Sequence, residues 1–392
     1  MQYDERQAGR PQECDDRSSG AAREAIDRDR RRLLCATGSG LLLGGFMAGQ
    51  TTASRAAAPQ LRWGVVGTGG IANRMAPMIA AAPSAALSAV SSRRMETARE
   101  FATAHDVGRA FDDWEAMLGW DGIDAVYVAT PTSVREEISL AAAGRGKHVL
   151  AEKPFASLDS LRRITRACRD NGVAFMDGTH FPHHPRTPAV RDRIARDIGW
   201  PWSLASAFQF SLPDRGNIRY DTTLEPMGAI GDAGWYNMRA VVEYLDPDVA
   251  LTATTCFARR DPETGAVVSA SGVLAFADGA TSTFDCGFDS GALVMDLRVT
   301  GANGVLWMDD YVIAKSADEA AYAWGSGGPN DLSRVTIAAT LPAAAQMFED
   351  FAVAAADAPS RDQWMQASER TQALLDGVWN AAIRHDDPAC DS

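Results

Sequence analysis

Three side chains, Lys153, Asp232 and Tyr236, could together carry acid/base chemistry at an oxygen atom. Asp232 and Tyr236 are four residues apart, which places both on one face of a helix that we expect to begin near Gly231. A tyrosine is a weak base at neutral pH, but a nearby ammonium group stabilises its phenolate form and lowers its pKa. We therefore predict that Tyr236 is the acid/base group and that Lys153 lowers its pKa and binds the substrate oxygen. Asp232 would orient a substrate hydroxyl or the lysine.

Simpler roles exist for the same residues. Asp232 could be a helix N-cap, Tyr236 a core aromatic and Lys153 a surface charge in a turn. Only three of the 38 basic residues are lysines, namely Lys147, Lys153 and Lys315, so a lysine in this chain is a rare choice. This scarcity favours a functional role for Lys153.

A glycine-rich turn lies well before these residues. The apolar run of residues 61–66 predicts a strand, and a helical segment rich in Ala and Met follows the turn. Such glycines let the backbone approach a pyrophosphate, which the free N–H groups of the helix N-terminus bind. The pattern alone also fits an ordinary turn. With its flanking strand and helix it predicts a dinucleotide site at Gly67, Thr68, Gly69, Gly70, Ile71 and Ala72.

A second predicted strand, residues 86–90, ends in Ser91-Ser92-Arg93-Arg94. An enzyme that uses NAD would favour an acidic residue here for the ribose 2′-hydroxyl. A small hydroxyl and two guanidinium groups suit a 2′-phosphate instead. We therefore predict NADP as the cofactor, with NAD the less favoured choice, although Arg93 and Arg94 could simply begin a solvated helix.

Two further strands complete the expected nucleotide-binding half. Residues 125–129 lead into Thr130-Pro131-Thr132, and residues 148–151 lead into Glu152-Lys153-Pro154. Strands that alternate with helices form a parallel, doubly wound sheet, the Rossmann arrangement. Ligands bind at the carboxyl ends of such strands, which is where both turns lie.

Composition narrows the class of function. The 392 residues suffice for two domains, and 46% hydrophobic with 23% charged residues is typical of a globular protein. A net charge of −13 argues against nucleic acid and anionic membranes, so we expect a small-molecule substrate. The six cysteines show neither a C-x-x-C pair nor metal-ligand spacing, and we predict no metal site.

The first sixty residues contain a candidate export signal. Three arginines, residues 30–32, precede an uncharged stretch that is rich in Leu, Gly and Ala and runs to Gln50. This pattern resembles a twin-arginine signal and predicts export to the periplasm without a remaining membrane anchor. A buried or membrane helix is the alternative, but five glycines from residue 38 to residue 49 make a helix poor. If the signal is not functional, the protein is cytoplasmic.

Four motifs occur in order: G-T-G-G-I-A, A-T-P-T-S, G-K-H-V-L-A-E-K-P and G-A-I-G-D-A-G-W-Y. Together they resemble the glucose-fructose oxidoreductase and inositol dehydrogenase family, Gfo/Idh/MocA, from residue 61 to about residue 385. After the candidate signal and linker (1–60), the resemblance implies an NADP-binding Rossmann domain (61–180) and an α/β domain (181–392) with an open, mainly antiparallel sheet. That second domain often mediates oligomerisation, so we expect a homo-oligomer.

The resemblance also assigns site residues. It places Lys153 beside the nicotinamide and adds cofactor contacts around the later turns. Many relatives carry histidine where this chain has Tyr236, and the tyrosine version resembles glucose-fructose oxidoreductase. Thr132 and Arg135 stand where many relatives have asparagine and histidine. Beyond the glycine turn, the predicted cofactor residues are Ser92, Arg93, Arg94, Thr130, Pro131, Thr132, Arg135, Glu152 and Lys153.

A histidine-rich segment, residues 180–185, leaves the predicted Rossmann domain. Its prolines and spacing do not suit a metal, and we expect the segment to line the substrate pocket. The predicted substrate-binding residues are His180, His184, Arg219, Asp232 and Tyr236.

These observations predict an NADP(H)-dependent oxidoreductase that transfers hydride between a sugar or polyol-like substrate and nicotinamide. An exported enzyme would meet no nicotinamide pool, so its cofactor would stay bound and be recycled by a second substrate. The alternatives are a sugar or dihydrodiol-type dehydrogenase with an exchangeable cofactor, an NAD-dependent glycosidase, and a non-enzymatic nucleotide or sugar sensor on the same fold.

Overall fold

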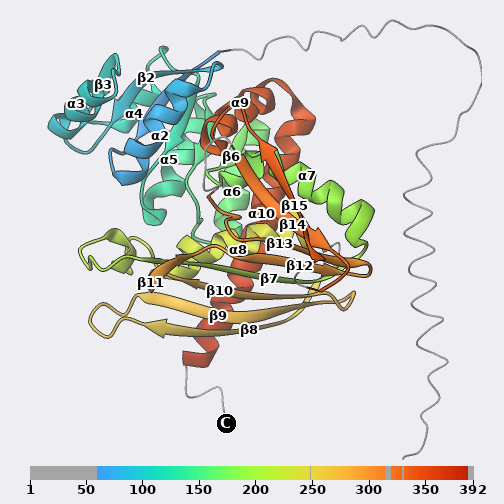
Figure 1. The fold of residues 1–392 in the computed structure, drawn as a ribbon. Coiled ribbons are helices and arrows are strands. Elements are labelled where there is room, and N and C mark those ends of the chain that lie inside the picture. The colour runs from blue at the N-terminus through green and yellow to red at the C-terminus, as the bar shows by residue number, and fades with distance from the viewer. Residues whose placement is uncertain (1–59, 248, 314–318, 329–330, 387–392) are drawn as a thin grey trace, which may run out of the picture. The chain divides into compact units, whose positions relative to one another are not determined.

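The computed structural model describes residues 60–247, 249–313, 319–328 and 331–386. The predicted signal and linker lie outside these ranges except for Gln60. Within them, two sheets and their helices belong to one compact unit (Figure 1). No helix in the described part of the chain is long and apolar enough to cross a bilayer.

The first sheet is parallel and has six strands in the order β3-β2-β1-β4-β5-β6. Its central strands are almost wholly buried because helices cover both faces, so they are nearly uninterrupted apolar runs. This order confirms the predicted doubly wound arrangement, with the switch point between β1 and β4. The strands are β1 (Leu61–Val66), β2 (Ala85–Ser91), β3 (Arg109–Phe111), β4 (Ala125–Val128), β5 (His148–Ala151) and β6 (Phe175–Asp177).

Six helices belong to this half of the molecule, and one of them comes from far along the chain. Trp63 of β1 packs edge-on against Phe348, with ring centres 5.0 Å apart, and lies 4.9 Å from Phe351. Both phenylalanines belong to α9, which therefore covers the parallel sheet. The helices are α2 (Gly70–Ala81), α3 (Met95–Ala104), α4 (Trp114–Leu118), α5 (Thr132–Gly144), α6 (Leu158–Asp170) and α9 (Ala343–Ala356).

The second sheet has nine strands in the order β15-β14-β13-β12-β7-β10-β9-β8, with β11 paired to β7. Its pairs are antiparallel except for β7 with β10, which confirms the predicted open, mainly antiparallel sheet. The strands are β7 (Pro201–Ser211), β8 (Leu251–Arg260), β9 (Val267–Phe276), β10 (Thr281–Gly287), β11 (Asp289–Val294), β12 (Leu297–Gly301), β13 (Gly304–Met308), β14 (Glu319–Gly325) and β15 (Ser333–Ala338).

Short helical segments follow β6 in the chain, and several of them contact strands of the second sheet. The helix expected near Gly231 is present, but its first turn is π-helical and the α-helix begins only at Trp235. The segments are η1 (Phe181–His183), α7 (Arg186–Arg193), η2 (Ile194–Ile198), η3 (Ile218–Tyr220), η4 (Ile230–Gly234), α8 (Trp235–Ala240) and η5 (Val241–Leu245).

The long helix α10 (Ala358–Asp386) contacts both sheets. Its buried Gln372 accepts a hydrogen bond from the backbone N–H of Phe155 (3.0 Å), and Asp376 accepts one from the N–H of Leu158 (2.7 Å). Gln372 also donates to Asp376 (2.7 Å). Helix α10 therefore holds the loop that follows Lys153, although the two are more than 200 residues apart.

Candidate active site

Lys153, Asp232 and Tyr236 meet between the two sheets. Lys153 follows β5, and its Nζ donates to Asp232 Oδ1 (2.7 Å) and to the Asp232 carbonyl (2.8 Å). The same nitrogen lies 4.8 Å from the ring centre of Tyr236. Gly231 allows this approach, because a Cβ there would lie 2.9 Å from Pro154 Cγ. The structure thus brings the three predicted residues together.

Asp232 lies between two cations. Arg219, in η3, donates to both oxygens of the Asp232 carboxylate, from Nε to Oδ2 at 2.5 Å and from Nη2 to Oδ1 at 3.1 Å. Burial alone would raise the pKa of Asp232, but the charges of Lys153 and Arg219 lower it below its usual range. Asp232 is therefore ionised at neutral pH. The group formed by Asp232, Lys153 and Arg219 carries one net positive charge.

Tyr236 is a half-buried phenol. Its ring packs edge-on against Phe208 at 5.2 Å between centres, with Phe181 at 6.5 Å. Burial raises its pKa well above the usual value, and the charges of Glu152 and Asp232 add to this effect. The expectation that Lys153 lowers this pKa is wrong for the present arrangement, since the ammonium lies over the ring and is hydrogen-bonded to Asp232. Tyr236 is therefore protonated at neutral pH.

Glu152 lies beside this group and is buried. Its Oε1 accepts a hydrogen bond of 2.5 Å from Tyr127 of β4. Burial raises the pKa of Glu152, and the adjacent charge of Lys153 opposes the shift. Its predicted contact with a cofactor stays a prediction.

The glycine turn and the N-terminus of α2 suit a pyrophosphate. Gly67 has φ of 102°, and a Cβ there would lie 2.7 Å from the Ala129 carbonyl, so the turn packs on the end of β4. Gly69 and Gly70 are exposed, and a Cβ on either would meet no atom within 4 Å. The first N–H groups of α2 therefore lie beside open space, as a phosphate site requires.

Asn73 is a residue that the sequence analysis missed. Its Nδ2 donates to the carbonyls of Thr68 and Gly69, both at 3.0 Å, while its Oδ1 lies 2.8 Å from His105 Nε2. Asn73 thereby fixes the glycine turn from the first turn of α2. A polar residue so close behind the glycines was the available signal.

The end of β2 lies next to the glycine turn. Thr68 Oγ1 donates to Ser92 Oγ (3.3 Å), and the Ser92 hydroxyl is 2.7 Å from Thr97 Oγ1. Arg93 and Arg94 are exposed immediately after Ser92. Two exposed guanidinium groups beside a hydroxyl at this position fit the 2′-phosphate of NADP. Of the other turn residues, Ile71 is half-buried and Ala72 is buried in α2.

The polar residues around the turn after β4, which were expected to contact the cofactor, bind other protein groups. Thr132 uses both its N–H (3.0 Å) and its hydroxyl (2.6 Å) to bind Glu225, a residue that the sequence analysis did not select. Arg135 donates to the carbonyls of Thr130 (2.5 Å) and Pro154. These polar groups of Thr132 and Arg135 are thus engaged with protein partners. Direct contact of either residue with the cofactor stays a prediction. Pro131 is the N-cap residue of α5.

The histidine-rich segment places His180 close enough to Lys153 to feel its charge, whereas the charged neighbours of His184 are Arg186 and Asp310. His180 and His184 each have a buried Nε2 without a hydrogen-bond partner among the described residues, as does Thr130 Oγ1. Burial lowers the pKa of both histidines to about 4, with further lowering of His180 by His183 and Lys153 and of His184 by Arg186. Both imidazoles are therefore neutral at pH 7. Across the described part of the chain, no three His, Cys, Asp or Glu side chains gather as a metal site would require.

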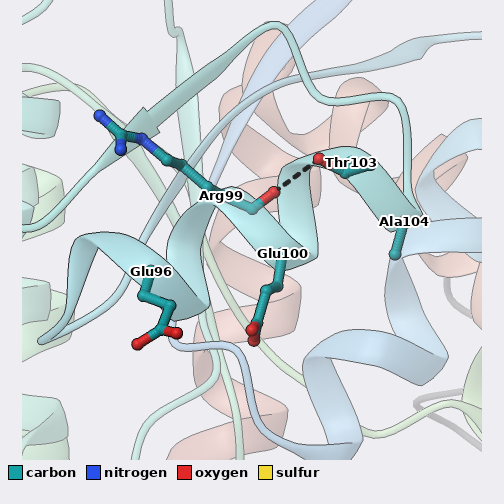
Figure 2. A pocket seen from close by; sticks show the side chains of 5 residues that line it. All are labelled: Glu96, Arg99, Glu100, Thr103 and Ala104. Carbon is teal, nitrogen blue, oxygen red and sulfur yellow. Dashed lines mark hydrogen bonds between the residues drawn. The ribbon is translucent and has the colours of Figure 1, made fainter.

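A surface pocket lies elsewhere, on the exposed side of α3. Figure 2 shows the side chains that line it, and all of them come from this helix. None of them is a predicted site residue. The lining residues are Glu96, Arg99, Glu100, Thr103 and Ala104.

A Rossmann sheet with a glycine turn, joined to a second sheet that presents Asp232 and Tyr236 to Lys153, defines an oxidoreductase with a dinucleotide site. Comparison with known proteins identifies the particular family: the chain belongs to the Gfo/Idh/MocA oxidoreductases. The model of the family's NAD-binding Rossmann domain matches residues 61–179. The model of its C-terminal domain matches residues 189–307.

Curated relatives act on sugars. D-xylose 1-dehydrogenase (NADP(+)) 2 of Haloferax volcanii is 34% identical over 234 residues, which cover 59% of this chain and 70% of the relative. The dTDP-3,4-didehydro-2,6-dideoxy-alpha-D-glucose 3-reductase of Actinomadura kijaniata is 32% identical over 252 residues, covering 64% of this chain and 74% of the relative.

Solved structures agree with this assignment. KijD10, a 3-ketoreductase from Actinomadura kijaniata in complex with NADP and TDP-benzene, superposes with a TM-score of 0.75 at 28% identity, over 82% of this chain and 98% of that chain. The aldose-aldose oxidoreductase of Caulobacter crescentus shares the fold, with a TM-score of 0.73 at 19% identity over 83% of this chain and 98% of that chain. NADP is named for the xylose dehydrogenase and is bound in the ketoreductase, in agreement with the predicted cofactor.

Proposed function

We propose that this protein is an NADP(H)-dependent oxidoreductase that transfers hydride between a sugar or polyol-like substrate and nicotinamide. The observation that carries the proposal is the contact of Lys153 with Asp232 and Tyr236 at the carboxyl end of β5, where ligands of such sheets bind. NADP specificity and sugar substrates of the relatives support it.

The protein groups divide into cofactor and substrate roles. The glycine turn and α2 would bind the pyrophosphate, and Ser92, Arg93 and Arg94 the 2′-phosphate. NADP, when bound, supplies the hydride acceptor or donor. Thr130 Oγ1 and His180 Nε2 are buried polar atoms still able to bind a ligand. Arg219 and His184 complete the proposed substrate-binding set.

Tyr236 is proposed as the proton donor to the substrate oxygen. Its pKa is raised, so the phenol holds its proton until a carbonyl oxygen gains negative charge during hydride addition. Lys153 stabilises that charge, and Asp232 keeps the ammonium in place through a hydrogen bond of 2.7 Å. The reverse path oxidises an alcohol and starts from the phenolate form of Tyr236, which takes up the proton of the alcohol hydroxyl.

The cofactor can be tested first. We would purify the full chain without added nucleotide, denature it and identify released nicotinamide by mass spectrometry, then screen aldoses, polyols and nucleotide-linked keto sugars. Stoichiometric NADP or NADPH would support a carried, recycled cofactor. Empty protein that binds added NADPH would favour an exchangeable-cofactor dehydrogenase. Protein that binds neither NADP nor NAD would contradict the oxidoreductase proposal.

Export is a separate proposal. We infer that residues 1–60 direct the folded, NADP-loaded protein through the twin-arginine route to the periplasm. The paired substitution Arg30→Lys with Arg31→Lys should then retain the protein in the cytoplasm, as measured by fractionation of cells. Periplasmic protein in that variant would contradict the twin-arginine route.

A homo-oligomer is proposed through the outer face of the nine-stranded sheet. Phe257, Val273 and Trp307 are 64%, 42% and 47% exposed on its strands β8, β9 and β13. Large apolar side chains grouped on one face are typical of an interface. Light scattering of the wild-type protein and of Trp307→Glu checks this proposal. A wild-type monomer, or an unchanged oligomer in the variant, would contradict it.

A further inference from the structure

We propose that Glu225 is a positioning residue: through Thr132 and Arg135 it holds the turn after β4 and the turn that carries Lys153 against the loop that leads to Asp232. This inference rests on the proposed function for its kinetic readouts but not for its measurement of stability.

A chain of hydrogen bonds carries the inference. Arg135 Nη1 donates to Thr132 Oγ1 (3.1 Å), and that hydroxyl in turn donates to Glu225 Oε2 (2.6 Å). Glu225 Oε1 accepts from the Thr132 backbone N–H (3.0 Å). The hydroxyl of Thr132 is thus oriented by a cation on one side and a carboxylate on the other, which strengthens both hydrogen bonds.

Arg135 extends this chain of hydrogen bonds to the turn that carries Lys153. It also donates to the carbonyls of Thr130 and Pro154, and Pro154 directly follows Lys153. Arg135 is only 3% exposed, and a buried guanidinium is costly unless nearby carboxylates and carbonyls compensate its charge. Burial lowers its pKa, while the charge of Glu225, followed by that of Glu152, opposes this shift. Glu225 therefore supports Arg135 electrostatically as well as through Thr132.

Glu225 occupies the segment that supplies the substrate side of the site. Arg219, which binds Asp232, lies six residues before it, and Asp232 lies seven residues after it. The backbone of Glu225 is fixed on both sides: its N–H donates to the Asp221 carbonyl (2.9 Å), and its carbonyl accepts from the Gly228 N–H (3.1 Å). A shift of Glu225 would therefore be transmitted to the loop between Arg219 and Asp232.

Two models make different predictions for Thr132. If Thr132 binds the cofactor directly, its loss weakens NADPH binding and adds to the loss of Glu225. If both residues act in one chain of contacts, removing either breaks the chain, and the second substitution costs little more. A double-mutant cycle distinguishes the two models.

The cycle uses Glu225→Ala, the nearly isosteric Thr132→Val and the double variant. We expect each single variant to lower kcat about 10-fold with little change in the KM of the sugar, and the double variant to resemble a single one. The Kd for NADPH, from fluorescence titration, should change less than about threefold in all three variants. Glu225→Gln keeps one acceptor oxygen and should recover part of kcat. Glu263→Ala, which removes an exposed carboxylate, is the control and should match the wild type.

Urea unfolding of the same variants tests the contact without any turnover. The equilibrium constant for unfolding should show about tenfold coupling between Glu225 and Thr132. Additive effects in both cycles, or a loss of NADPH affinity confined to Thr132→Val, would overturn the inference. Coupled unfolding in a protein without NADP binding would refute the proposed function and leave the structural contact standing.

Discussion

Lys153 Nζ and Asp232 Oδ1 lie 2.7 Å apart, although the residues are 79 positions apart and belong to the two different halves of the molecule. Their side chains are 7% and 15% exposed. Removing one partner of such a pair leaves a charge in a poorly hydrated place, so each partner keeps the other in position. Arg219 reduces this dependence for Asp232, since it binds the same carboxylate.

Lys153→Met should therefore impair the reaction far more than the fold. We expect kcat to fall about 100-fold or more, because a charge that stabilises the reacting oxygen is lost. Steady-state kinetics with NADPH and the best carbonyl substrate measures this loss. Lys147→Met is the matched control: Lys147 donates to the Ile123 carbonyl (2.9 Å), outside the site. Equal losses in the two variants would contradict the role of Lys153.

Tyr236→Phe should remove the proton donor and keep the packing. The ring stays against Phe208 and Phe181, so we expect nearly unchanged unfolding, but a fall in kcat of about 10²- to 10⁴-fold. Tyr244→Phe is the control, since Tyr244 also neighbours Phe181 but is fully buried and shares a hydrogen bond with Thr187 (3.2 Å). Activity of Tyr236→Phe near that of Tyr244→Phe would exclude Tyr236 as the donor.

Replacing Arg93 and Arg94 together by alanine should change cofactor choice. Loss of two charge-assisted contacts should raise the Kd for NADPH about 100-fold, while the Kd for NADH changes less than about threefold. Fluorescence titration with both nucleotides measures the ratio. Arg99→Ala removes an exposed arginine of α3, the helix that begins directly after Arg94 (Figure 2), and should leave both values unchanged. Parallel weakening of NADPH and NADH would argue against a 2′-phosphate site.

His184 should make stability depend on pH. Burial lowers its folded pKa from 6.5 to about 4, so between these values the unfolded chain binds more protons. The free energy of unfolding should therefore fall as the pH drops through this window, by about 1.4 kcal/mol per pH unit for this group. His184 Nδ1 accepts from the Arg186 N–H (3.0 Å), an acceptor that His184→Asn can retain. Urea unfolding from pH 7 to 4.5 should show a shallower slope in this variant, and an unchanged slope would refute the assignment.

Local sequence patterns were sufficient for the four central strands of the parallel sheet, β2, β1, β4 and β5. Buried strands such as β1 and β4 are short apolar runs, and the turns that follow them contain Gly, Pro and Thr. Short strands at the sheet edges, β3 and β6, have three residues each and were not predicted. Three residues give too little periodicity to recognise.

Site residues that belong to a sequence motif could be predicted. Residues whose role depends on contacts with distant parts of the chain could not. Lys153, Asp232 and Tyr236 each belong to a motif. Glu225 does not, and its bond to Thr132 spans 93 positions. The raised pKa of Tyr236 was missed for a related reason, because it depends on burial and on carboxylates that surround the ring. Spacing along the chain carries no information on such neighbours.

Helix α10 makes the timing of synthesis important for this protein. A ribosome adds about 5–20 residues per second, so Gln372 follows Phe155 by about 10–40 s. Until then the N–H groups of Phe155 and Leu158 lack their acceptors on α10. A chain that stalls before this helix would contain every predicted catalytic residue but would lack the support beneath Lys153. Such a nascent chain would be a natural client for chaperones.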